Sequence, residues 1–100
     1  MRIPILYDIN DLMINSVDLR TACGKKALMI AEADIDMRTI KFLRSTGKTS
    51  WSMSYDKFVE VYIGVVEGHI PIEYKEIDLH LPTFGNYAVG LINFFRDSQK

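Results

Sequence analysis

The sequence predicts an α+β domain in which a small antiparallel sheet, at about residues 28–53, is packed by three or four helices. Apolar and polar residues alternate with a period of two through much of residues 29–53, as is typical of strands. Residues 54–68 instead have the i, i+3, i+4, i+7 apolar spacing of an amphipathic helix. Because 100 residues can build one core but not two, residues 1–100 are predicted to form a single small globular domain.

The composition agrees with this fold class. Apolar residues make up 48% of the chain and charged residues 25%, close to the average for soluble globular proteins, which argues against a disordered chain. Every apolar run is far shorter than the roughly 20 residues that a membrane span requires. The first residues have one base and soon meet Asp8 and Asp11, unlike a signal peptide, so a cytoplasmic protein is expected.

The first predicted element is a helix that begins at Asn10 or Asp11 and continues to about Cys23. Asn and Asp are favoured N-caps, and Gly24 stands where a left-handed C-terminal cap is wanted. The following segment, residues 27–37, fits two structures: it is rich in helix formers, but its regular alternation favours a strand. The alternating apolar residues are Met29, Ala31, Ala33, Ile35 and Met37.

The apolar parity changes after residue 38, which predicts a turn or bulge near Asp36–Arg38. Residues 39–44 then form a second strand, residues 45–48 a turn, and residues 49–53 a returning strand. In that last strand the alternation places Trp51 and Met53 on one face and Ser50 and Ser52 on the other.

A core-facing helix is predicted next, capped by Ser54 and ended by Gly68, with Asp56 favourably placed in its first turn. Its apolar stripe consists of Phe58, Val61, Tyr62, Val65 and Val66. Residues 70–81 fit two structures, a bulged strand or a short helix opened by Pro71.

The last predicted helix follows Thr83 as its cap. Gly85 and Gly90 weaken this helix but permit close packing against a neighbour. Its apolar stripe is Tyr87, Leu91, Phe94 and Phe95.

The net charge of −1 conceals an asymmetry along the chain. Residues 25–57 carry seven bases and four acids, a local +3, whereas residues 58–100 carry three bases and six acids, a local −3. Four of these seven bases lie within residues 38–48, which contain no acid, and two more lysines precede that stretch. We expect these bases to contact nucleic acid: Lys25, Lys26, Arg38, Lys41, Arg44 and Lys48.

The predicted hairpin tip places hydroxyl donors beside two of these bases. Ser45, Thr46 and Thr49 could join Arg44 and Lys48 in binding phosphate oxygens. The plainer explanation is a solvated hairpin end whose charge protects a sheet edge from strand addition.

The letters Gly47-Lys48-Thr49 do not complete a phosphate-binding P-loop. That motif requires a glycine five residues before Gly47, where Phe42 stands, and a helix directly after the loop. A nuclease-type metal site built on Asp56 with Glu73 and Lys75 is also a poor match, because no strand scaffold unites the two carboxylates. The run Glu73, Lys75, Glu76 and Asp78 is therefore expected to be a solvated face.

No metal site, cofactor or catalytic triad is expected. Cys23 is the only cysteine, and neither it nor His69 or His80 stands at a ligand spacing such as C-x-x-C or H-x-x-x-H. His69 follows a predicted helix end, where its partial positive charge has a structural explanation.

The expected function is therefore a non-enzymatic binding module. From Ile40 to Gly68, the order of strand, Arg44-Ser45-x-Gly47, strand and capped helix resembles small α+β modules attached to bacterial restriction and defence enzymes. The resemblance implies a bacterial or phage source and no residue roles. The alternative is a protein-interaction domain, an inhibitor, adaptor or homodimer, that uses Phe94 and Phe95, which cannot both point directly inward.

Overall fold

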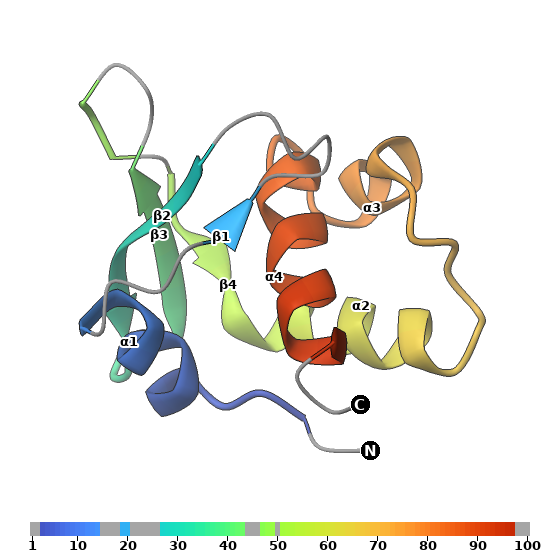
Figure 1. The fold of residues 1–100 in the computed structure, drawn as a ribbon, viewed down its shortest axis with the longest axis horizontal. Coiled ribbons are helices and arrows are strands. Elements are labelled where there is room, and N and C mark those ends of the chain that lie inside the picture. The colour runs from blue at the N-terminus through green and yellow to red at the C-terminus, as the bar shows by residue number, and fades with distance from the viewer. Residues whose placement is uncertain (1–2, 15–18, 21–26, 44–46, 50, 98–100) are drawn as a thin grey trace.

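The computed structural model describes residues 3–14, 19–20, 27–43, 47–49 and 51–97, and it confirms the α+β class. Within these residues, four helices accompany an antiparallel sheet of four strands in the order β1-β2-β3-β4. The elements are α1 (Leu6–Ile14), β1 (Leu19–Arg20), β2 (Ala27–Asp34), β3 (Thr39–Leu43), β4 (Met53–Ser54), α2 (Tyr55–Val66), α3 (Tyr74–His80) and α4 (Gly85–Asp97). In Figure 1 the sheet lies on one side, α2 and α3 lie on the other, and α4 runs between them. Within the described residues, no helix combines the length and apolar character needed to cross a membrane.

The strand predicted over residues 27–37 exists as β2, but its apolar parity differs from the prediction. Ile30 pairs with Phe42, and then Glu32 pairs with Lys41, so one extra residue bulges between Ile30 and Glu32. Ile30 and Phe42 consequently face the core, whereas Glu32 is exposed. Near residues 36–38 the structure has a turn, as predicted, and the bulge lies farther back in β2. An inserted residue reverses which face the following side chains occupy, and simple alternation cannot show this.

The first helix begins and ends earlier than predicted. It covers Leu6–Ile14, and Leu19–Arg20 belong to β1, so a helix running from residue 10 to Cys23 is wrong. The Ile5 amide donates to the Asp8 carboxylate at 3.1 Å, which starts the helix before Asn10. Cys23 and Gly24 lie outside the described residues.

Helix α2 confirms its prediction at both ends. The Ser54 hydroxyl accepts a hydrogen bond from the Lys57 amide at 3.2 Å, and Gly68 has a φ of 83°, the left-handed conformation typical of a C-terminal cap. The predicted stripe is buried except for Val66, which is 38% exposed.

The predicted strand before α2 is shorter than the sequence indicates. Thr49 forms only an isolated bridge with Leu43, and regular pairing resumes at β4. Met53 is buried, but Trp51 is 76% exposed, so the shared face predicted for these two residues is wrong. Trp51 precedes the paired strand, and no ladder therefore fixes its side chain to the inward face.

Residues 70–81 contain a helix, which settles the alternative left open by the sequence. Helix α3 begins at Tyr74, three residues after Pro71, and packs against α4. Thr83 does not act as the predicted cap of α4, since its φ is 72° and the Gly85 amide donates to the Asp78 carboxylate at 3.1 Å. A side chain from α3 thus accepts a hydrogen bond from the first turn of α4. Asp78, which was expected only to belong to a solvated face, therefore also caps this helix.

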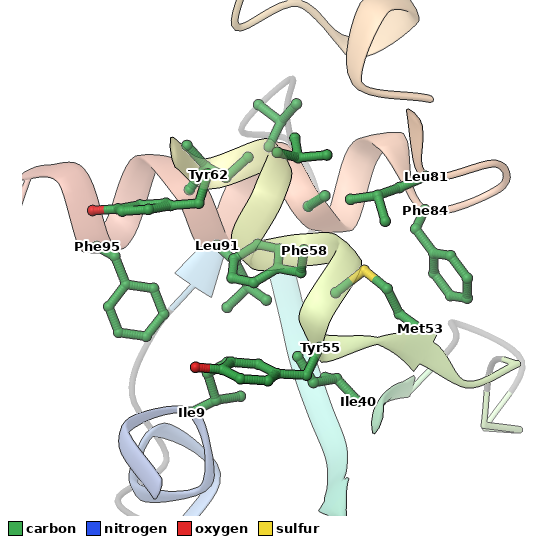
Figure 2. Close-up of a cluster of buried hydrophobic side chains, with 14 of the residues drawn as sticks. Ile9, Ile40, Met53, Tyr55, Phe58, Tyr62, Leu81, Phe84, Leu91 and Phe95 are labelled. Carbon is green, nitrogen blue, oxygen red and sulfur yellow. The ribbon is translucent and has the colours of Figure 1, made fainter. Parts of the chain in front are cut away.

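The core joins the sheet to the helices. Tyr55 of α2 lies near Ile9 of α1 and Ile40 of β3 (Figure 2). Phe42 of β3 stacks on Tyr87 of α4, with ring centroids 4.8 Å apart and planes 10° from parallel. The largest fully buried side chains come from six of the eight elements and the segment before α1: Pro4, Ile9, Ile40, Phe42, Met53, Phe58, Val61, Tyr62, Ile77, Leu91 and Ile92.

Candidate nucleic-acid interface

The structure describes three of the six predicted contact bases, and it does not gather them into one patch. Arg38 precedes β3, Lys41 lies within it and Lys48 lies in the loop that follows it. Five strand residues separate Arg38 from that loop, roughly 17 Å of extended chain. Lys25, Lys26 and Arg44 lie outside the described residues.

Arg38 is held by an acid from another element. Its guanidinium donates to both carboxylate oxygens of Asp56 in the first turn of α2, with distances of 2.6 Å from one terminal nitrogen and 3.1 Å from Nε. The same guanidinium lies over the Tyr55 ring, 5.1 Å from its centroid. Arg38 also has a φ of 55°, which is uncommon for a residue with a side chain. Arg38 therefore joins the β2–β3 turn to α2, and the Asp56 carboxylate offsets part of its charge.

Tyr55 extends this arrangement to the N-terminal segment. Its hydroxyl donates to the Pro4 carbonyl at 2.7 Å in a buried site. Burial raises the pKa of Tyr55, against the opposing effect of the Arg38 cation, so the hydroxyl keeps its proton and remains a donor. The turn at Arg38, the start of α2 and the chain around Pro4 are thus joined at one place.

Acid should weaken this arrangement. The Arg38 hydrogen bond lowers the pKa of Asp56 below its ordinary value, so the ionised pair stabilises the fold above the unfolded pKa of about 3.9. That stabilisation is lost as the pH falls through the lower, folded pKa. We expect the difference in unfolding free energy between the wild type and Asp56→Asn to shrink from pH 6 toward pH 2. Urea titrations at several pH values would measure it, and a difference that stays constant with pH would contradict the ion pair.

Lys41 also has an acidic neighbour. Its Nζ lies 4.0 Å from a carboxylate oxygen of Glu32, directly across the β2–β3 ladder. The Lys41 side chain remains 38% exposed, and a pair this long and accessible to water holds the lysine only weakly. Lys41 can thus contribute charge to the outer face of the sheet, but Glu32 reduces that charge.

The loop between β3 and β4 presents its described residues to solvent. Gly47, Lys48 and Thr49 are exposed. Gly47 has a φ of 84°, a left-handed conformation that glycine adopts readily in a turn. This part of the loop lies at the upper left of Figure 1, away from the helices and from both chain ends. Trp51 follows it with 76% of its surface exposed. The sequence prediction did not include Trp51 among the site residues, because alternation placed it on the same face as Met53, which is buried.

The other candidate sites are not assembled. Asp56 is paired with Arg38, whereas Glu73 and Lys75 are exposed at the start of α3. Within the described part of the chain, no three His, Cys, Asp or Glu side chains group closely enough to hold a metal ion. Phe95 is buried at 9% exposure and contacts the half-buried Phe94 edge to face, so the last helix does not present both rings to a partner.

Comparison of the chain with protein-family models, curated proteins and solved structures finds no match.

Proposed function

We propose that this protein is a small binding module that contacts nucleic acid through the β3–β4 loop. The observation that carries the proposal is the exposure of Lys48 and Thr49 in a segment that holds bases but no acids. From Arg38 to Tyr55 the chain has four bases and no Asp or Glu. Two of those bases, Arg38 and Lys41, have acidic partners in the fold. The proposal therefore rests on the bases of the loop.

The chemistry of the loop suits a phosphate backbone. Lysine binds a phosphate oxygen as a point charge, and threonine and serine hydroxyls donate hydrogen bonds to the same oxygens. Arg44 stands at the start of the loop in the sequence and would add a second base. A net charge of −1 gives no attraction by the molecule as a whole, so binding should be weak and confined to this surface.

The test is binding of fluorescently labelled DNA and RNA, both single-stranded and duplex, at about 50 and 200 mM salt. The wild type is compared with Arg44→Ala/Lys48→Ala and with Lys57→Ala/Lys75→Ala, which removes two exposed lysines from α2 and α3. We expect the loop variant to weaken binding at least several-fold and to flatten its salt dependence, by about 0.7 to 0.9 in the logarithmic slope per lost phosphate contact. The matched variant should bind nearly as the wild type does. Equal loss in both variants, or no binding at low salt, would exclude the loop as the contact.

A protein-interaction module is the second candidate, and we propose α1 as its surface because Phe95 of α4 is buried. Tyr7 and Ile14 stand seven residues apart on one face of α1 and are 60% and 65% exposed. Ile5, just before the helix, is 49% exposed. Apolar residues gathered in this way are typical of a contact surface. Association that depends on protein concentration and not on salt would favour this candidate.

A further inference from the structure

Trp51 is the feature of the loop that phosphate binding does not explain. It is the only tryptophan in the chain, and it is 76% exposed, more than any other large apolar residue in the described part. Tryptophan is a residue that folding normally buries at least in part. With this much of its surface exposed, the indole offers a flat aromatic face to a partner.

The surroundings of Trp51 favour a base over a protein side chain as that partner. Aromatic anchors of protein interfaces sit among other apolar residues that exclude water around them. The exposed neighbours in the described sequence are instead Lys48, Thr49 and Ser52, and the apolar Met53 is buried in the core. A positive charge and hydroxyls next to an aromatic face are the combination that single-strand binding proteins use, with the cation on the phosphate and the ring on the base.

The spacing of the two groups is compatible with one short stretch of nucleic acid. Lys48 and Trp51 are three residues apart, at most roughly 10 Å along an extended chain. Successive nucleotides in a stacked strand are about 3.4 Å apart along the axis. A phosphate at Lys48 and a base at Trp51 can therefore belong to the same nucleotide or to a near neighbour.

We propose that Trp51 stacks on an unpaired base, so that the ligand of the loop is single-stranded DNA or RNA. In a duplex each base face is covered by the next base pair, and an aromatic side chain cannot reach it without unstacking the helix. An unpaired base leaves its face open. This inference rests on the proposed function and adds the class of nucleic acid to it.

The single tryptophan makes the contact directly observable. Its fluorescence, excited where tyrosine does not absorb, should be quenched on titration with dT or rU oligonucleotides of about 12 nucleotides and should not change with a duplex of equal length. Trp51→Ala should weaken single-strand binding roughly 5- to 150-fold, because stacking contributes about 1–3 kcal/mol per base. Trp51→Phe should restore most of that loss. Equal affinities for the dT and rU oligonucleotides would show that the indole contacts the base and does not distinguish deoxyribose from ribose.

The outcomes separate this inference from the proposed function. If Arg44→Ala/Lys48→Ala weakens all binding but Trp51→Ala changes nothing, the loop binds phosphates and stacking is excluded. If Trp51→Ala weakens duplex and single-strand binding equally, base stacking is also excluded. If the Trp51 fluorescence is quenched as the protein concentration rises in the absence of nucleic acid, Trp51 lies in a contact between protein molecules and base stacking is excluded. If no oligonucleotide binds at low salt, the proposed function itself fails. Thermal unfolding of each variant checks that the fold is intact.

Discussion

Phe42→Ala is expected to lower the free energy of unfolding by about 3–5 kcal/mol, the usual cost of removing a buried aromatic ring. Phe42 is fully buried in β3, stacks on Tyr87 and lies 6.2 Å from the Phe84 ring. These contacts join the sheet to α4 and its preceding turn, and aromatic pairs add about 0.5–1.5 kcal/mol beyond the buried area. For a domain whose total stability is about 5–15 kcal/mol, the loss is a large fraction.

Urea unfolding of Phe42→Ala and Phe42→Leu would measure this effect. Leucine fills most of the space but cannot stack, so Phe42→Leu should cost only about 1–2 kcal/mol. We expect a lower midpoint at an unchanged slope, which indicates lost stability without a change in the unfolded chain. A cost below about 1 kcal/mol for alanine would mean that β3 does not pack against α4 in this register.

Gly85→Ala is expected to lower the free energy of unfolding by about 2–3 kcal/mol, the upper part of the range for overpacking. A methyl group at this position would lie 2.8 Å from the Tyr74 carbonyl oxygen and 2.8 Å from the Asp78 Cβ. Backbone cannot move aside without shifting α3 from α4. The substitution would also disturb the hydrogen bond from the Gly85 amide to Asp78, which satisfies the first turn of α4.

Gly64→Ala is the matched control, because its new methyl group meets only a side chain. The nearest atoms are the Ile70 Cδ1 at 2.5 Å and Cγ1 at 2.9 Å, and both belong to a half-buried side chain that can shift more easily than backbone. Alanine in the interior of α2 also gains about 1 kcal/mol in helix propensity. Gly64→Ala should therefore unfold within about 1 kcal/mol of the wild type. Equal costs at the two glycines would contradict the close approach of α3 and α4.

The parts of the fold predicted from sequence are those whose causes are local. Helix α2 carries its own cap in Ser54, its own stop in Gly68 and a stripe with the helical period. Each signal acts within a few residues, so sequence spacing is sufficient to find it. Helix α1 shows the limit, because an Asp8 side chain that accepts the Ile5 amide competes with the more obvious cap at Asn10 or Asp11.

The candidate site was predicted only in part for the same reason. The sequence identifies the bases, but the acids that pair with them are distant along the chain. Asp56 follows Arg38 by 18 residues, and Glu32 reaches Lys41 only through the β2–β3 register. A segment without acids in sequence is therefore not a segment without acids in space.

By itself the sequence determined the fold class, the sheet near residues 28–53, helix α2 and the basic composition of the β3–β4 loop. These follow from periodicity, capping and charge, which act over short stretches of chain. Only the tertiary structure decided the β2 bulge, the capping of α4 by Asp78, the pairing of Arg38 with Asp56 and the exposure of Trp51. Each of these depends on which elements meet in the folded chain, and long-range pairing has no signature in the spacing of one sequence.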